Sequence, residues 1–365
     1  MKKIRIQTQQ GIYPVTIGDS YINQLLSFLE KYNLLTSLFL VIDKNVARYH
    51  LRTIQTAFSE FKGKISYTFL SPGERVKSYT ELKKIHERLT QYNFGRESTL
   101  IAIGGGVTGD TAGYAASTYM RGIRLVHIPT TLLAMIDSAI GGKTGINFMG
   151  RKNIIGTFYQ SRLVFVDTMF LSSLPQIEFN SALGELIKYG LISNKEFQTF
   201  LTESIDKISS SKNKSIEKAI VESIKIKAGV VERDEFEQSG LRKILNLGHT
   251  FAHAFESNLG FRLKHGEAVT AGIVCALFLS NKLGLLISKK LEKLLSLPEK
   301  INVPSIIKNV KEEKIIEAMY SDKKNRKDNI MFVLISDIGK IVVDVPAEKR
   351  NIIYAINKMK EFFSL

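Results

Sequence analysis

Half of the six histidines in this chain lie close together, at His249, His253 and His265. His249 and His253 are four residues apart, so a helix would place both imidazoles on one face, one turn apart. Further upstream, Glu185 and Lys188 would place a carboxylate and an amine one helical turn apart. Two imidazoles and one carboxylate, with a position left for substrate or water, form a common catalytic Zn²⁺ arrangement. The spacing therefore predicts a metal site with His249 and His253 as equal candidates, and the alternative is a set of unrelated surface or core histidines.

A glycine-rich segment follows an apolar run in the first half of the chain. It reads Gly104-Gly105-Gly106-Val107-Thr108-Gly109-Asp110. This spacing satisfies G-x-G-x-x-G, and we expect a helix to open at Thr111, with its amide donors facing a pyrophosphate. The acid that would bind ribose hydroxyls about 20 residues later has no good candidate. Asp43 and Glu74 are alternatives for that role, and a tight strand–helix turn without a ligand is the other interpretation.

The stretch from residue 121 to 157 is dense in small and charged residues. We expect Lys143 and Lys152 to lie in glycine-containing turns, where backbone amides also bind anions. The run G-G-K-T that contains Lys143 is similar to the end of a P-loop. However, Asp137 stands where that motif requires its first glycine, which excludes a P-loop NTPase.

The arrangement of apolar residues indicates what must position these groups. Near-continuous apolar runs alternate with helical patterns in the first half, which is typical of a parallel α/β sheet. From about residue 180 to 320 the patterns are helical, so we predict an α/β domain followed by a mostly α-helical one. The predicted strands are residues 37–43, 64–70, 98–103, 123–128 and 163–166, with hairpins from 4–6 with 15–17 and from 330–336 with 340–345.

Composition narrows the classes of partner. The net charge of +16 raises the question of nucleic acid, but the lysines are scattered and no nucleic-acid-binding module is present, so we predict none. The single cysteine, Cys275, excludes an internal disulfide and a thiolate cluster, and its apolar surroundings predict burial. The longest apolar run is too short for a bilayer, and the N-terminal pattern lacks the apolar core of a secretory signal. We expect a cytoplasmic protein without a membrane partner.

Taken in order, the motifs resemble the 3-dehydroquinate synthase family of sugar-phosphate cyclases, from about residue 43 to 324. The motifs are G-G-G-V-T-G-D, P-T-T-L-L-A-x-x-D-S, G-G-K-T-G-I-N, K-N-I-I-G-T-F, G-E-L-I-K-Y, L-N-L-G-H-T-F-A-H-A-F-E and H-G-E-A-V. The resemblance implies a lyase of the shikimate pathway, which leads to chorismate and the aromatic amino acids. Its substrate would be the sugar phosphate 3-deoxy-D-arabino-heptulosonate 7-phosphate. Transient oxidation by NAD, phosphate elimination, re-reduction and intramolecular aldol closure would give 3-dehydroquinate.

The resemblance also implies cofactors, domains and assembly. The cofactors are NAD and a divalent metal, Zn²⁺ or Co²⁺. The domains are a Rossmann-like NAD-binding domain at residues 1–178 and a helical metal- and substrate-binding domain at 179–365. The assembly is a homodimer, and Arg121 is a residue that the resemblance allows to reach the partner subunit's site.

The family's functional positions fall on particular residues of this chain. The metal ligands would be Glu185, His249 and His265, with His253 as a proton-transfer group instead of a ligand. The NAD pocket would comprise Asp43, Glu74, Lys77, Gly105, Gly106, Val107, Gly109, Asp110, Thr130, Thr131, Lys143, Lys152, Phe170, Leu171, Ser172 and Ser173. The substrate site would comprise Asp137, Lys143, Asn153, Lys188, Lys227, Arg242, Asn246, His253 and a late lysine, Lys324.

Two other functions remain open from the sequence. One is a related enzyme of the same fold, either another sugar-phosphate cyclase or a metal-dependent polyol dehydrogenase that releases NADH. The other is a binding protein that keeps the fold without turnover, against which the intact metal and proton-transfer residues argue.

Overall fold

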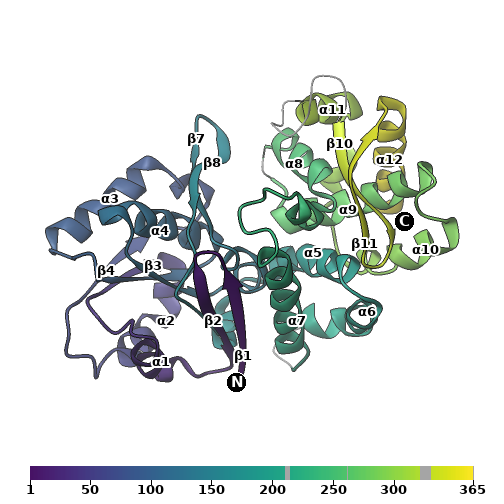
Figure 1. The fold of residues 1–365 in the computed structure, drawn as a ribbon. Coiled ribbons are helices and arrows are strands. Elements are labelled where there is room, and N and C mark those ends of the chain that lie inside the picture. Colours follow the sequence, from purple (N-terminus) through teal and green to yellow (C-terminus); the bar gives the residue numbers. More distant parts are fainter. Residues whose placement is uncertain (210–213, 261, 321–329, 365) are drawn as a thin grey trace. The chain divides into compact units, whose positions relative to one another are not determined.

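The computed structural model describes residues 1–209, 214–260, 262–320 and 330–364 (Figure 1). The chain divides into two compact units. The first comprises Met1–Pro175 and Lys227–Phe236, and the second comprises Gln176–Ile226 and Glu237–Leu365. The expected division into residues 1–178 and 179–365 treated each domain as one continuous stretch, and it did not anticipate the return of Lys227–Phe236 to the first unit.

A seven-stranded sheet forms the centre of the first unit. In spatial order its strands are β1 (Lys2–Thr8), β2 (Gly11–Gly18), β9 (Leu163–Asp167), β6 (Arg124–Pro129), β5 (Thr99–Gly104), β3 (Leu38–Asp43) and β4 (Ile65–Leu70). β1 and β2 form the predicted antiparallel hairpin, and every other neighbouring pair is parallel. All residues of β5 and β9 are buried, which is why these strands read as continuous apolar runs.

Helices of the first unit pack on this sheet. They are α1 (Leu25–Lys31), α2 (Lys44–Ala57), α3 (Tyr79–Gln91) and α4 (Gly106–Thr118). Side chains of α3 and α4 pack with those of β3 and β5 in one buried apolar cluster. Chain connections leave β3 and β5 in opposite directions across the sheet, so the ends of these strands flank a topological switch point, the usual ligand position in such sheets. The helix expected from Thr111 starts at Gly106, directly after its N-cap Gly105.

A second hairpin of the first unit was missed by the sequence reading. Strands β7 (Lys143–Phe148) and β8 (Arg151–Phe158) pair antiparallel and stand away from the large sheet (Figure 1). Lys143 and Lys152 therefore lie on strands and not in turns, which corrects the expectation. The glycines that suggested turns instead let two backbones approach, since a Cβ at Gly156 would lie 2.0 Å from the Thr144 carbonyl oxygen.

The second unit is mainly helical, as predicted. Its elements are α5 (Gln176–Ile192), α6 (Lys195–Ser209), the first part of α7 (Lys214–Val231), α8 (His249–Asn258), α9 (His265–Lys282), α10 (Ser288–Leu295), α11 (Glu312–Tyr320), the hairpin β10 (Ile330–Asp337) and β11 (Lys340–Ala347), and α12 (Lys349–Phe362). α9 is the central helix, since it packs against α5, α8, α12 and β10. Its side chains are buried on nearly every side, including Cys275 as expected. Within the described residues, no helix combines the length and the apolar character needed to span a bilayer.

Candidate active site

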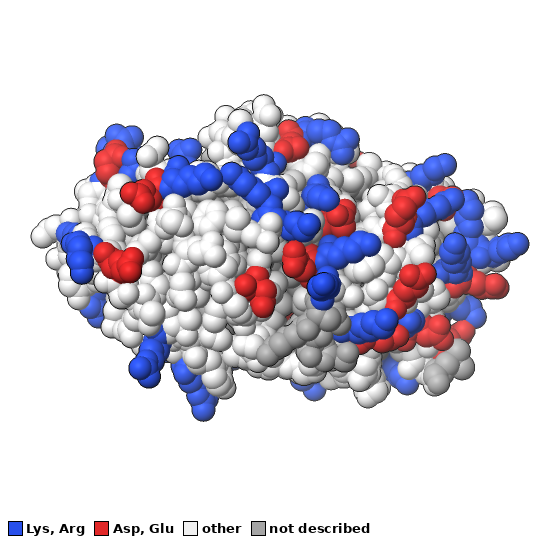
Figure 2. Space-filling view, turned by 90° about the horizontal axis from the view of Figure 1, so that it is seen from below, with Lys and Arg blue, Asp and Glu red and all other residues white. Residues whose placement is uncertain are grey.

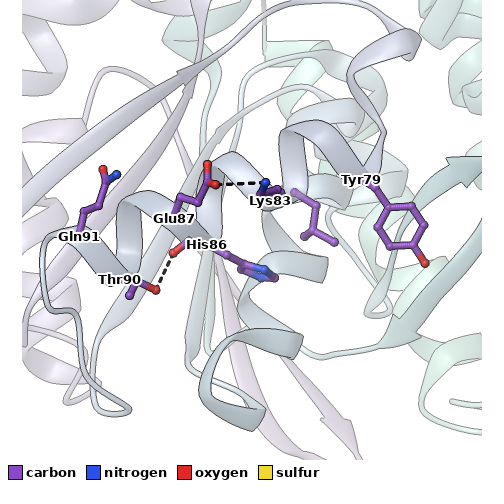
Figure 3. Close-up of a pocket in the computed structure, with 7 residues that line it drawn as sticks. Tyr79, Lys83, His86, Glu87, Thr90 and Gln91 are labelled. Carbon is purple, nitrogen blue, oxygen red and sulfur yellow. Dashed lines mark hydrogen bonds and ion pairs between the residues drawn. The ribbon is translucent and has the colours of Figure 1, made fainter.

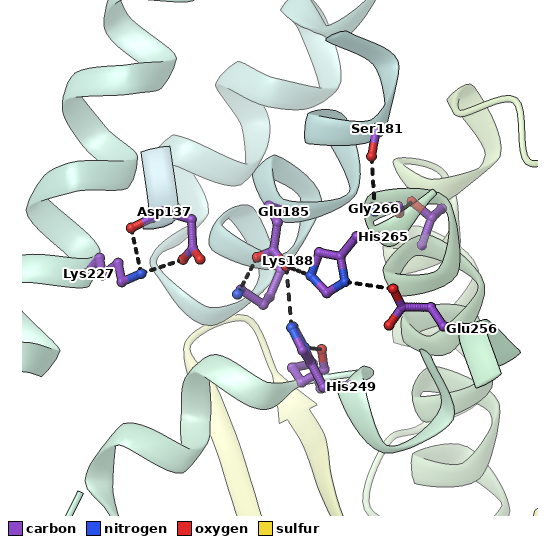
Figure 4. A network of polar contacts seen from close by, with 11 residues as sticks. Asp137, Ser181, Glu185, Lys188, Lys227, His249, Glu256, His265 and Gly266 are labelled. Carbon is purple, nitrogen blue, oxygen red and sulfur yellow. Dashed lines mark hydrogen bonds and ion pairs between the residues drawn. The ribbon is translucent and has the colours of Figure 1, made fainter. Parts of the chain in front are cut away.

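Three helices of the second unit bring one carboxylate and two imidazoles together. Glu185 comes from the middle of α5, His249 is the first residue of α8, and His265 is the first residue of α9. One oxygen of Glu185 lies 3.4 Å from His249 Nε2 and 3.3 Å from His265 Nε2 (Figure 4). The three ligand atoms all lie within 4.8 Å of one another. Two nitrogens and one oxygen at this spacing suit a divalent cation such as Zn²⁺ and leave coordination positions for substrate or water.

Glycines make this convergence possible. A Cβ at Gly184, beside Glu185, would lie 2.0 Å from the carbonyl oxygen of Gly266, and a Cβ at Gly266 would lie 1.4 Å from the carbonyl oxygen of Ser181. Helices α5 and α9 therefore cross with their backbones in direct contact. A similar approach joins α8 to α9, since a Cβ at Gly272 would lie 2.2 Å from the carbonyl oxygen of Gly248. The ligand-bearing helices are thus closer than helices with larger side chains could be.

Partners of the second ring nitrogen orient both imidazoles. His249 Nδ1 lies 3.3 Å from the carbonyl oxygen of Leu247, and because a carbonyl only accepts, Nδ1 must carry the proton and donate it. His265 Nδ1 lies 3.5 Å from a carboxylate oxygen of the buried Glu256 (Figure 4). Such partners fix the tautomer of a metal-binding histidine and point Nε2 at the metal. The sequence reading missed Glu256, although its position seven residues after His249 places it on the same face of α8.

Burial and neighbouring charges shift the pKa values of this cluster. Lys188 forms an ion pair with Glu185 on α5. Burial by itself would raise the pKa of Glu185, but Lys188 and the two histidines hold it well below its usual range. Burial lowers the pKa of His249 to about 4. Burial also opposes the charged form of His265, yet Glu185 and Glu256 outweigh it and raise its pKa to about 10. The site thus stabilises cationic charge beside a buried carboxylate.

His253 occupies a different position from the three grouped residues. It lies one turn after His249 on α8 and is exposed, and its ring centroid is 5.6 Å from that of His249 in an edge-to-face arrangement. The structure therefore groups His265, and not His253, with Glu185 and His249. This resolves the geometry that the spacing of His249 and His253 had left open.

Other predicted substrate residues of the second unit lie on the segment before α8. The 3-10 helix η6 (Leu241–Asn246) carries Arg242 and ends at Asn246. Arg242 is only 2% exposed, and its Nε lies 3.7 Å from Glu237 Oε1. A planar guanidinium held in this way is suited to bidentate contact with a phosphate or carboxylate. The predicted Lys324 lies outside the described residues.

In the first unit, the start of α4 offers the predicted phosphate cradle. Gly105 is the N-cap of this helix, Gly106, Val107 and Gly109 lie in its first turn, and no side chain of the described residues caps this end. A Cβ at Gly105 would lie 3.0 Å from Thr131 Cγ2, and one at Gly106 would lie 3.0 Å from Ser138 Oγ, so larger residues at these positions would crowd their neighbours. The buried hydroxyl of Thr130 has no hydrogen-bond partner among the described residues. The backbone amides of this helix end and the unsatisfied Thr130 hydroxyl fit a bound pyrophosphate.

Asp43 ends β3 at the same edge of the sheet and caps α2. One of its carboxylate oxygens accepts a hydrogen bond from the backbone of Asn45 at 2.8 Å, and the Thr108 hydroxyl lies 3.5 Å from the other. Burial raises the pKa of Asp43 despite these hydrogen bonds. Its place beside the switch point agrees with the role expected of a ribose-binding acid.

Lys77 joins several predicted site residues into one cluster. Its side chain is 4% exposed, and its Nζ donates to Asp110 at 2.6 Å and to Asn153, and lies 3.9 Å from Glu74. Burial raises the pKa of Asp110, although Lys77 opposes this. Four residues predicted from three separate segments therefore meet around one buried ammonium group.

The remaining predicted residues of the first unit are spread over several elements. Lys227 Nζ donates to Asp137 at 2.8 Å, which ties the returning segment Lys227–Phe236 to the rest of the unit. The 3-10 helix η5 (Thr168–Ser173) contains Phe170, Leu171, Ser172 and Ser173. His50 anchors it, because His50 Nε2 lies 2.6 Å from Ser173 Oγ and its ring contacts Phe170 edge to face. Arg121 is exposed, with a left-handed backbone at φ 63°.

A groove of about 590 Å³ runs along α3 (Figure 3). Its walls are Tyr79, Leu82, Lys83, His86, Glu87, Thr90 and Gln91, and no predicted site residue is among them. The net charge of +16 is also not reflected in a basic stripe on the face shown in Figure 2, where acidic groups lie among the Lys and Arg side chains. The chemistry-bearing residues therefore define the candidate site better than surface shape or surface charge does.

Comparison with known proteins gives a consistent result. Two family models match, 3-dehydroquinate synthase N-terminal over residues 67–181 and 3-dehydroquinate synthase C-terminal over residues 182–325. A 3-dehydroquinate synthase of Pelagibacter ubique (strain HTCC1062) is 41% identical over 359 residues, which cover 96% of each chain.

Solved structures show the same architecture. A 2-deoxy-scyllo-inosose synthase complexed with carbaglucose-6-phosphate, NAD⁺ and Co²⁺ is 26% identical, with a TM-score of 0.88 over 97% of this chain and 99% of that one. A 2-epi-5-epi-valiolone synthase from Streptomyces hygroscopicus subsp. jinggangensis 5008, with NAD⁺ and Zn²⁺ bound, shares the fold at 24% identity and a TM-score of 0.87, over 96% and 97% of the two chains. The predicted fold class, a Rossmann-like parallel α/β domain followed by a helical domain, is confirmed. With both family models matched and a relative of 41% identity along nearly its whole length, this chain belongs to the 3-dehydroquinate synthase family.

Proposed function

We propose that this protein is a 3-dehydroquinate synthase that releases phosphate from 3-deoxy-D-arabino-heptulosonate 7-phosphate and forms 3-dehydroquinate in the shikimate pathway. The observation that carries the proposal is the convergence of Glu185, His249 and His265, in a chain matched by both family models. Identity of 41% to a 3-dehydroquinate synthase, against 26% to the 2-deoxy-scyllo-inosose synthase, favours this substrate over that of the related cyclase.

The proposed cofactors are NAD and Zn²⁺ or Co²⁺, which the solved relatives contain. The donor set of two imidazoles and a carboxylate fits the metal, and the glycine cradle with the unsatisfied Thr130 hydroxyl fits the NAD pyrophosphate. When bound, the metal supplies a Lewis acid that lowers the pKa of a substrate hydroxyl, and NAD accepts and returns a hydride. In functional terms, residues 1–178 would form the NAD-binding domain and residues 179–365 the metal- and substrate-binding domain.

The protein's own groups would bind the substrate and move protons. His253, exposed and next to His249, would take the proton of the hydroxyl that is oxidised. The buried Arg242 would hold an anionic group of the substrate through its planar fork, and Lys188 would add charge beside Glu185. Asn246, Asp137, Lys143, Asn153, Lys227 and Lys324 complete the proposed substrate set, and Arg121 would act on the partner subunit in a homodimer.

The protein would act in the cytoplasm. A biosynthetic enzyme with one buried cysteine and no membrane-spanning helix among its described residues suits a cytoplasmic location. The partners would be the sugar-phosphate substrate and a second copy of the chain.

The test is an assay of the purified protein with the heptulosonate phosphate, NAD and Zn²⁺. We expect phosphate and 3-dehydroquinate in equal amounts, from NAD present well below the substrate concentration, because each turnover regenerates NAD. NADH that accumulates in proportion to substrate would indicate a polyol dehydrogenase instead. Phosphate release from a different ketose phosphate only would indicate another cyclase.

A further inference from the structure

Asn147 lies at an irregular point of the β7–β8 hairpin. Strand pairing runs regularly to Ile146 opposite Ile155, and then resumes at Phe148 opposite Arg151. Asn147 is therefore the single residue across from three residues of β8, which include Lys152 and Asn153. An irregularity of this kind bends a strand and redirects its side chains, and such bulges often adjoin active sites.

The Asn147 side chain connects Glu74, which lies outside the hairpin, to the β8 side of this irregularity. Its Nδ2 donates to Glu74 Oε1 at 2.9 Å and to the Glu74 carbonyl oxygen at 3.3 Å. Its Oδ1 accepts from the backbone N–H of Asn153 at 2.9 Å, and its own backbone N–H donates to the Lys77 carbonyl oxygen at 2.8 Å. These partners fix the orientation of the amide, because only Nδ2 can donate to a carboxylate and only Oδ1 can accept from an N–H.

The partners of Asn147 are themselves proposed ligand-binding groups. Glu74 belongs to the proposed NAD pocket and, with Asp43, is one of the two candidates for the ribose acid. It lies in the 3-10 helix η2 (Glu74–Val76) and is 42% exposed, so its own surroundings hold it weakly. Asn153 has a left-handed backbone with φ 51°, a conformation that needs local support. Its side chain returns to the buried Lys77, which also binds Asp110. One amide thus supports both the exposed carboxylate and the strained backbone.

We propose that Asn147 is a positioning residue that holds Glu74 for NAD and the β8 bulge for the anionic ligand. This inference rests on the proposed function, since it assigns Asn147 a role through residues of the proposed NAD and substrate sites. Asn147 itself needs no contact with either ligand. Its contribution is to keep an acidic group and a basic strand segment in one fixed arrangement before NAD arrives.

The test measures NAD affinity by titration calorimetry for the wild-type protein, Asn147→Ala, Glu74→Ala and the double variant. We expect each single substitution to weaken NAD binding about tenfold, a loss typical of one or two hydrogen bonds. Because Asn147 acts largely through Glu74, the double variant should lose much less NAD affinity than the roughly 100-fold expected of independent sites. Met149→Ala is the matched control in the same hairpin, since Met149 is 84% exposed at the hairpin tip, and it should bind NAD like wild type.

A second variant separates positioning from folding of the hairpin. Asn147→Asp keeps the oxygen that accepts from Asn153 but places a carboxylate 2.9 Å from Glu74, so NAD binding should again weaken about tenfold although the hairpin stays formed. Wild-type NAD affinity in both Asn147 variants, or a double variant whose loss equals the product of the single losses, would overturn the inference and leave the proposed function standing. A wild-type protein that binds no NAD would instead overturn the proposed function, and this inference with it.

Discussion

The close crossing of α5 and α9 predicts a strong effect of one added methyl group. In Gly184→Ala, the new Cβ would lie 2.0 Å from the Gly266 carbonyl oxygen, whereas an ordinary contact begins at 3.4 Å. The helices must therefore separate locally by roughly 1.4 Å, since neither atom is part of a flexible side chain. Glu185 follows Gly184 directly and His265 precedes Gly266, so this separation acts on two of the three proposed ligands.

The magnitude follows from the tolerance of metal sites. Metal–ligand distances vary by only about 0.2 Å, so a shift of this size removes a ligand or distorts the set. Loss of only the hydrogen-bond partner of a metal ligand costs about 10–100-fold in metal affinity. We therefore expect Gly184→Ala to bind Zn²⁺ at least about 100-fold more weakly, or ~2.7 kcal/mol. Overpacking should also destabilise the second unit by ~1–3 kcal/mol.

The assay is competition with a chromophoric Zn²⁺ chelator at a temperature where circular dichroism shows both proteins folded. Gly190→Ala is the control in the same helix. Its Cβ would lie 2.8 Å from the end of the Leu201 side chain, which can move, and at ordinary contact distances of 3.6 and 3.8 Å from Leu297 Cδ2 and Gln198 Cα. The control should keep wild-type metal affinity. If folded Gly184→Ala binds Zn²⁺ within threefold of wild type, close glycine packing does not position the ligands and the reasoning is wrong.

Three further predictions concern individual residues. Glu256→Gln should weaken Zn²⁺ binding about 10–100-fold in the same competition assay, because His265 Nδ1 loses its carboxylate partner, and unchanged affinity would remove Glu256 from the site. His249→Ala should lose bound metal by elemental analysis, whereas His253→Ala should keep it and lose turnover; equal metal depletion in the two variants would contradict the assigned roles. Burial lowers the pKa of His127 to about 4, so between pH 6.5 and 4 the unfolded chain binds a proton that the folded chain excludes, and stability falls as pH falls through this window. His127→Gln should remove up to about 3 kcal/mol of that fall in urea unfolding of the first unit, and an identical pH profile would refute the assignment.

Much of the fold could be predicted because strand and helix periodicities are local properties. The apolar runs that end at Asp43 and before Gly105 form parallel strands β3 and β5, and their ends meet at the expected edge of the sheet. The β7–β8 hairpin was missed because the glycines near Lys143 and Lys152, such as Gly142 and Gly156, suggested turns in the sequence. Glycine at such positions allows a close approach of two strand backbones, and this approach can be recognised only when the pairing of the strands is known.

The sequence by itself determined which residue types were present for chemistry and which helix carried them. It supplied the imidazole pair on α8 and the carboxylate–amine pair on α5, since neighbours three or four residues apart meet on any helix. Residue spacing left His249 and His253 as equal candidates, and only the family resemblance implied His265. The tertiary structure brings His265 and not His253 to Glu185 and His249, because the closeness of atoms from three helices depends on where those helices cross. It also decided the positions of Glu256 and Asn147, whose partners lie in other segments of the chain. A local pattern can specify a side chain and its face, but only packing sets its distance to groups far away in the sequence.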